Sequence, residues 1–262
     1  MKFGICTGLE GAQDAANAGF DYIEINVQAH LKPEAPEAEF LPVFKQIMSS
    51  PVPCYAANCF VPGHLKITGP AVNWDALEKY LVTAFARAER AGVRVIVFGS
   101  GGARQVPDGF SRSEANLQLA RFGRLCDSLA KEHDVTVVVE PLNRGECNIL
   151  NSVNEGAHLV HAVDLSHFRL LVDAYHWAKE NEPAGDIVTH GALLKHAHIA
   201  TYPARKAPGL EATDFQPFFN ALKAAGYSGG LSIEGGWNSM AVDAAPALAE
   251  MRRCAIIAGY SV

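Results

Sequence analysis

The chain has 262 residues, of which 49% are hydrophobic and 19% are charged, and its formal net charge is −6. This much apolar sequence excludes a disordered chain, and the length allows one large domain or two small ones. The acidic balance argues against a nucleic-acid partner, since such proteins need a surplus of Lys and Arg to neutralise phosphates. Apolar runs fall far short of the ~20 residues that span a bilayer, so no membrane partner is expected.

The first residues, Met1–Gly8, carry one charged side chain and too short an apolar stretch for a secretory signal, so we expect a cytoplasmic protein. The six cysteines form no Cys-x-x-Cys pair. Scattered thiols in a chain of this size are most simply small buried hydrophobes, and a disulfide framework is not expected.

Short apolar runs with strand character alternate with longer stretches of helical periodicity, which is the pattern of repeated βα units. In chain order the expected strands are Phe3–Cys6, Tyr22–Asn26, Pro53–Asn58, Val93–Phe98, Val135–Glu140, Phe168–Asp173, Lys195–Ile199 and Leu231–Glu234. The expected helices lie at about 11–18, 37–49, 74–91, 112–132, 152–163, 184–193, 214–225 and 240–258. Eight such units predict a single (β/α)8 TIM barrel that occupies residues 1–262 as one domain.

Local signals support these boundaries. Three Ala-Gly pairs, at Gly19, Gly92 and Gly226, stand where a helix is expected to end, because glycine adopts the left-handed conformation without a Cβ penalty. Asn73 and Ser111 are suitable N-caps for the third and fourth helices. The glycine-rich stretch 99–102 is expected to be a loop, either near a ligand or simply flexible.

The informative feature is how the last four expected strands end. The apolar strands of the second half finish at Glu140, Asp173, His198 and Glu234. Active sites of TIM barrels are built from the C-terminal ends of strands, so these four side chains are expected to meet at the barrel mouth. Three carboxylates brought together repel one another unless a cation neutralises them. The pattern therefore predicts one bound divalent metal, and three oxygen ligands with one imidazole suit Mn²⁺ or Mg²⁺ and tolerate Co²⁺ or Zn²⁺.

Further polar side chains lie in the loops that follow these strands. They are Asn143, Arg144 and Glu146 after the fifth strand, His176 after the sixth and Arg205 after the seventh. A turn that leaves the sixth strand would bring His176 over the same opening as the acid three residues before it.

At these positions the sequence resembles the xylose-isomerase-like TIM-barrel superfamily, and within it the sugar isomerase/epimerase branch that contains the ketose 3-epimerases. The resemblance rests on Glu140-Pro141-Leu142-Asn143-Arg144 with Glu146, the step from Asp173 to His176, His198 in Lys-His-Ala-His-Ile, Arg205 ahead of Ala-Pro-Gly, and Glu234. It extends over most of the chain, although its specific motifs lie in residues 140–234.

The resemblance implies that Glu140, Asp173, His198 and Glu234 bind one divalent ion, usually Mn²⁺, and that Glu140 and Glu234 also act as paired acid and base. It implies that Glu146, His176 and Arg205 hold the oxygens of a sugar. The implied reaction is removal of a proton next to a ketose carbonyl through an enediolate, which a metal stabilises. Return of the proton to the opposite face gives C3 epimerisation of a free ketose.

Other reactions fit the same ligands. A hydroxypyruvate isomerase and an inosose or dehydroshikimate-type dehydratase stay open as alternatives, and a non-catalytic sugar-binding barrel is a further one. An endonuclease IV-like nuclease is disfavoured, because the ligands for two of its three metals are missing and the net charge is acidic. The partner is therefore expected to be a small-molecule sugar, and the chain is a possible homo-oligomer.

Two side chains carry open questions. His196 lies two residues before His198, so both point to the same side of the strand, and either can supply the imidazole on spacing alone. The resemblance favours His198. Glu24 ends the second strand and either contacts substrate or makes a structural hydrogen bond.

Overall fold

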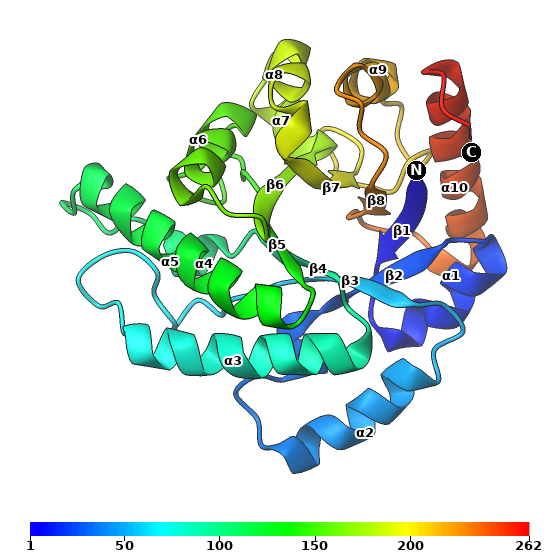
Figure 1. Ribbon diagram of the computed structural model, residues 1–262. Coiled ribbons are helices and arrows are strands. Elements are labelled where there is room, and N and C mark those ends of the chain that lie inside the picture. The colour runs from blue at the N-terminus through cyan, green and yellow to red at the C-terminus, as the bar shows by residue number, and fades with distance from the viewer. Residues whose placement is uncertain (262) are drawn as a thin grey trace.

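The computed structural model describes residues 1–261, and within them eight parallel strands form a closed barrel (Figure 1). Each strand pairs with the next in sequence, and β8 closes the barrel by pairing with β1. This arrangement confirms the predicted (β/α)8 fold. The strands are β1 (Lys2–Cys6), β2 (Tyr22–Asn26), β3 (Cys54–Asn58), β4 (Val95–Phe98), β5 (Thr136–Val139), β6 (Phe168–Asp173), β7 (Leu194–Ile199) and β8 (Gly230–Ile233).

Helices fill the connections and surround the barrel (Figure 1). The predicted ones are present as α1 (Ala12–Ala18), α2 (Glu37–Met48), α3 (Trp74–Ala91), α5 (Arg112–Glu132), α6 (Val153–Val163), α8 (Ala184–Thr189), α9 (Gln216–Ala224) and α10 (Met240–Ile257). Two short helices were not predicted, α4 (Gly101–Arg104) and α7 (Ala174–Lys179). The stretch expected to be a glycine-rich loop is therefore only partly a loop, because its second half begins α4. Single turns of other helix types occur at Leu9–Gly11, Val27–Leu31 and Gly191–Leu193.

The predicted helix ends are formed by the residues that signalled them. Gly19 and Gly92 follow α1 and α3 with φ of 88° and 77°, and Gly226 has φ of 70° just after α9. The side chains of Asn73 and Ser111 accept backbone N–H groups in the first turns of α3 and α5. These caps satisfy backbone groups that a helix end leaves without a partner.

Side chains alternate between the two faces of each strand, so one apolar core lies between the strands and the helices and another lies inside the barrel. Residues such as Ile23, Ile25 and Ala197 point outward and pack under the helices in one large apolar core. Their neighbours point into the barrel, where an apolar cluster is formed by Tyr22, Ala56, Val95, Val97, Val138 and Leu171. Interior positions of β2, β7 and β8 instead carry buried polar side chains, namely Glu24, His196, His198 and Ser232. The polar part of the barrel interior is where the candidate site lies.

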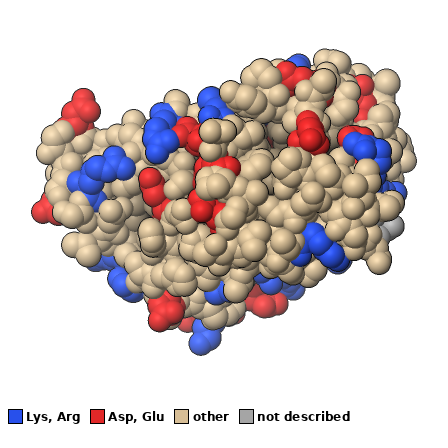
Figure 2. Space-filling view, turned by 90° about the horizontal axis from the view of Figure 1, so that it is seen from above, with Lys and Arg blue, Asp and Glu red and all other residues tan. Residues whose placement is uncertain are grey.

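The surface mixes charges of both signs. Figure 2 shows basic and acidic side chains interspersed on the face seen from above, without a continuous basic stripe on that face. In the part of the chain that the structure describes, none of the helices combines the length and the apolar character required to cross a bilayer.

Candidate metal centre and active site

Four strand ends bring the candidate ligands together. Asp173 is the last residue of β6 and His198 lies in β7, where the strand register pairs the two directly. Glu140 and Glu234 each follow the last residue of their strands, β5 and β8, so the predicted strands were one residue too long at these two ends. Because parallel strands end at one mouth of the barrel, consecutive strands deliver consecutive ligands.

The distances describe a compact cluster around one imidazole nitrogen. His198 Nδ1 lies 3.3 Å from Glu140 Oε1, 3.5 Å from Glu234 Oε2 and 4.0 Å from Asp173 Oδ2. One donor atom from each of the four residues lies within 4.8 Å of all the others. His198, Asp173 and Glu140 are 4% exposed or less, so the cluster is largely withdrawn from solvent.

The donor set fits a divalent cation. Asp173 Oδ1 accepts the backbone N–H of Tyr175 at 2.6 Å and that of His176 at 3.4 Å, which fixes the carboxylate. Its other oxygen, Oδ2, is buried and has no hydrogen-bond partner among residues 1–261. A buried carboxylate oxygen without a partner is costly, and a metal ion in the cluster would satisfy it. Three carboxylates and one imidazole are ligands that Mn²⁺, Mg²⁺, Co²⁺ and Zn²⁺ accept.

Crowding of the acids perturbs their protonation. Burial and the nearby Glu234 raise the pKa of Glu140. Burial acts in the same direction on Glu234, but His198 and Arg205 outweigh it and hold the pKa of Glu234 below its usual value. Burial opposes charge on His198 as well, yet the surrounding carboxylates, Glu24 first among them, raise its pKa well above the usual value. The cluster thus attracts positive charge, which is the electrostatic condition for binding a cation.

The three side chains predicted to hold a substrate lie beside the acid cluster. Arg205 Nη2 donates to Glu234 Oε2 at 2.7 Å and Nη1 donates to Glu146 Oε1 at 3.2 Å. The guanidinium carbon lies 4.9 Å from the centre of the Tyr175 ring, which supports it from one side. His176 is 2% exposed, and its Nε2 lies 3.9 Å from Glu146 Oε2. These groups therefore adjoin the acid cluster.

The tautomer of His176 follows from its neighbour Asn143. The backbone N–H of Asn143 points to His176 Nδ1 at 3.3 Å, and the Asn143 amide nitrogen lies 2.8 Å from the same atom. Both Asn143 groups are donors, so Nδ1 accepts and the proton resides on Nε2. That Nε2–H is buried and has no partner among the described residues. It is a free donor at the edge of the cluster.

The structure shows the surroundings of both side chains that carried open questions. His196 Nε2 lies 2.8 Å from Glu24 Oε2, and His198 Nε2 lies 2.9 Å from Glu24 Oε1, whereas only His198 turns its other nitrogen toward the acid cluster. Glu24 is 1% exposed and makes buried hydrogen bonds to both histidines. Arg144, noted in the same loop as Glu146, instead pairs with Glu180 and is mostly exposed.

Two residues that shape the site were missed. Arg104, fully buried, donates to the carbonyl of Phe98 at 2.9 Å and to that of Glu140 at 2.6 Å, and so ties the ends of β4 and β5 together. Gly99 leaves room for an acid, because a Cβ at this position would lie 2.2 Å from Glu140 Oε2. The glycine-rich stretch in the sequence was the only signal for either residue, and it does not reveal which side chain fills the space.

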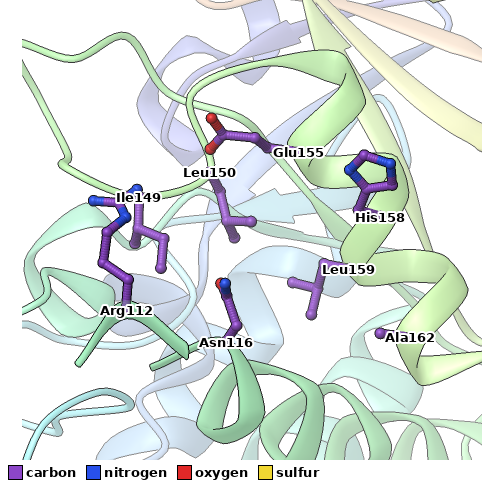
Figure 3. A pocket seen from close by; sticks show the side chains of 8 residues that line it. All are labelled: Arg112, Asn116, Ile149, Leu150, Glu155, His158, Leu159 and Ala162. Carbon is purple, nitrogen blue, oxygen red and sulfur yellow. The ribbon is translucent and has the colours of Figure 1, made fainter. Parts of the chain in front are cut away.

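A separate cleft of about 420 Å³ lies between α5 and α6 (Figure 3). Two of its polar side chains bond to the neighbouring loop: Arg112 donates to the Asn148 carbonyl at 2.7 Å, and Glu155 accepts the Asn151 N–H at 2.8 Å. None of its lining residues belongs to the acid cluster. We therefore assign the candidate active site to the barrel mouth.

The fold and the acid cluster define a TIM barrel with a candidate metal centre. Comparison with known proteins shows the family to which the chain belongs. The sequence model of the family described as xylose isomerase-like TIM barrel matches residues 12–254. The chain belongs to this family.

Two curated relatives are epimerases. The chain is 32% identical over 113 residues to 3-dehydro-D-guloside 4-epimerase from Escherichia coli, a match that spans 43% of each protein. It is 29% identical over 230 residues to L-ribulose 3-epimerase from Methylomonas sp., which spans 84% of this chain and 75% of that enzyme. Six further epimerase relatives are matched over only 35–42% of their own length.

Solved structures share the fold along the whole chain. A crystal structure of D-psicose 3-epimerase in the presence of D-fructose superposes with a TM-score of 0.85 at 20% identity, covering 97% of this chain and 99% of that one. The superposition shows that the two chains share the barrel fold.

Proposed function

We propose that the protein is a divalent-metal-dependent sugar epimerase that inverts C3 of a free ketose. The observation that carries this proposal is the cluster of Glu140, Asp173, His198 and Glu234, whose donor atoms lie within 4.8 Å of one another at the barrel mouth. The relatives matched over most or part of the chain are named as epimerases, which supports the class of reaction.

These four residues would hold the ion, and Mn²⁺ is the ion we expect. When bound, the ion would draw electron density from the ketose oxygens and so make the neighbouring C–H proton acidic enough to leave. One carboxylate of the pair Glu140 and Glu234 takes that proton from C3. The other returns a proton to the opposite face of C3, which inverts the centre and leaves every other bond intact.

The surrounding side chains bind and orient the sugar. His176 Nε2–H, free of any partner in residues 1–261, donates to a sugar oxygen. Arg205 donates to other sugar oxygens, and Glu146 accepts from sugar hydroxyl groups, since Arg205 joins Glu146 to Glu234 of the acid cluster. In the sequence, Lys206 is the only basic residue within five positions of Arg205, and this short basic run leads us to propose an unphosphorylated substrate.

The test is a deuterium-exchange assay on the Mn²⁺-loaded protein in D2O. A panel of D-psicose, D-tagatose, L-ribulose, hydroxypyruvate and an inosose is incubated and analysed by NMR and chromatography. The proposal expects deuterium at C3 of a ketose together with its C3 epimer. An aldose product, loss of water, or no exchange with any compound contradicts it and indicates, respectively, an isomerase, a dehydratase or a binding protein.

Two variants locate the chemistry. Glu140→Gln and Glu234→Gln should each abolish the exchange, because an amide neither accepts nor returns the proton. Glu114→Gln, an exposed acid in the first turn of α5, is the matched control and should exchange at the wild-type rate. Normal exchange in both active-site variants would remove these residues from the acid and base roles.

A further inference from the structure

A buried polar network lies inside the barrel next to the acid cluster, and its centre is Glu24 on β2. Ser232 Oγ donates to Glu24 Oε2 at 2.7 Å, and Tyr22 Oη lies 3.0 Å from the same hydroxyl. His196 Nε2 contacts Glu24 Oε2 at 2.8 Å. Glu24, His196 and Ser232 are each 1% exposed or less, so water does not replace these contacts.

The other oxygen of Glu24 is directed at the imidazole of the acid cluster. His198 Nε2 lies 2.9 Å from Glu24 Oε1, a contact across the barrel between β2 and β7, which are not neighbouring strands. An ionised carboxylate only accepts, so the hydrogen must reside on His198 Nε2. The lone pair of a metal-binding imidazole is then on Nδ1, the atom that faces Glu140, Asp173 and Glu234.

We propose that Glu24 is a positioning residue that fixes the tautomer and the orientation of His198 for metal binding. The inference rests on the proposed function, because it concerns the ion that the epimerase would use. Glu24 Oε2 contacts His196 and accepts from Ser232, and these contacts orient the carboxylate so that Oε1 faces His198 Nε2. A carboxylate that accepts from a ligating imidazole raises the basicity of that ligand and restricts its rotation.

The geometry also offers a different use of the same atoms. Cys6, Glu24 and His198 provide donor atoms that lie within 4.8 Å of one another, which is close enough for a second ion. In that case His198 Nε2 would carry no hydrogen and would be a ligand itself. The positioning role requires a hydrogen on His198 Nε2, whereas binding of a second ion requires that this nitrogen carry none. The measurements below distinguish the two.

The first measurement is metal affinity, by titration calorimetry of the metal-free protein with Mn²⁺. Glu24→Gln should bind Mn²⁺ about 10- to 100-fold more weakly than wild type, as is usual when the partner of a ligating histidine is lost. Asp127→Asn is the matched control, because it neutralises a buried carboxylate on α5 that accepts the backbone N–H of His167 and lies outside the acid cluster. It should keep the wild-type affinity. Equal affinities of Glu24→Gln and wild type, or an equal loss in both variants, would overturn the proposal.

The second measurement needs no substitution of Glu24 and no enzymatic activity. In protein labelled with ¹⁵N-histidine, the His198 signals are assigned by their absence in His198→Gln. We expect a hydrogen on Nε2 both without metal and after Mg²⁺ loading. An Nε2 without hydrogen, or two ions per chain in the calorimetry, would contradict the positioning role. Absence of any metal binding by wild type would refute the proposed function instead, and the Nε2 signal would still report the Glu24 contact.

Discussion

Substitution of Gly99 by alanine adds one methyl group next to Glu140, so it tests the metal centre with little change to the fold. The φ of Gly99 lies outside the left-handed region, so alanine is compatible with the backbone there. The Cβ of Gly99→Ala would, however, lie 2.2 Å from Glu140 Oε2, whereas ordinary contacts begin near 3.4 Å. The carboxylate must therefore retreat by roughly 1.2 Å, the difference between these two distances.

A shift of this size matters to a metal site and little to the fold. Ligand distances are normally kept within about 0.2 Å, and misplacement of a reacting group by about 1 Å reduces a rate by roughly 100-fold. The Glu140 side chain is flexible at its far end, so the stability of Gly99→Ala should change little. We expect a loss of Mn²⁺ affinity by calorimetry and a roughly 100-fold fall in deuterium exchange.

Gly102→Ala is the matched control, because its nearest contact would be the Gly63 Cα at 3.5 Å. This variant should bind Mn²⁺ and exchange deuterium as wild type does. If Gly99→Ala and Gly102→Ala behave alike in both assays, the placement of Glu140 in the metal centre is wrong.

Three further predictions concern single groups. Arg104→Met leaves the buried Glu140 carbonyl without a donor and removes one of the two donors to the Phe98 carbonyl, so it should lower the free energy of unfolding in urea by about 1–3 kcal/mol. Substitution of the exposed Arg112 by Met should change it by less than about 1 kcal/mol, and equal stabilities of the two variants would refute this role of Arg104. Burial raises the pKa of Glu182 to about 7, so the native state binds its proton more tightly than the unfolded state, and this group makes stability fall as pH rises from about 4.5 to about 7. The decrease in the free energy of unfolding over this pH range amounts to about 1 kcal/mol after allowance for solvent screening, and it should be absent in Glu182→Gln. A pH profile of unfolding that is the same in this variant and wild type would contradict the prediction. Asp173→Ala should lose the metal-induced rise in Tm that chelator-stripped wild type regains with Mn²⁺, and retention of the rise would exclude Asp173 as a ligand.

Much of the fold could be predicted because its signals are local. Apolar strands, capping side chains such as Asn73 and glycines such as Gly92 act over a few residues, and each stands where the sequence places it. The short helices α4 and α7 were missed because four to six residues do not complete enough turns to show a helical period. Predicted strand ends differ from the observed ends by at most one residue, except at the start of β4, where the difference is two.

The site residues that could be predicted are those at the ends of strands. Glu140 and Asp173 each end an apolar run, and barrel topology then implies that they meet. The choice between His196 and His198 could not be made from spacing, since both point inward and both contact Glu24. What distinguishes them is that Nδ1 of His198 faces the acid cluster in the folded barrel. The burial of Arg104 likewise depends on how the barrel closes, so it could not be predicted from the sequence. The single-domain extent, the possible homo-oligomer and the cytoplasmic location stay predictions.

The most direct test of the account is the location of the metal itself. Crystals grown with Mn²⁺ and measured at the manganese absorption edge should show one anomalous peak among Glu140, Asp173, His198 and Glu234, and crystals of Asp173→Ala should lack it. A peak elsewhere with none among these four side chains, or no peak in wild type at saturating Mn²⁺, would contradict the proposed metal centre.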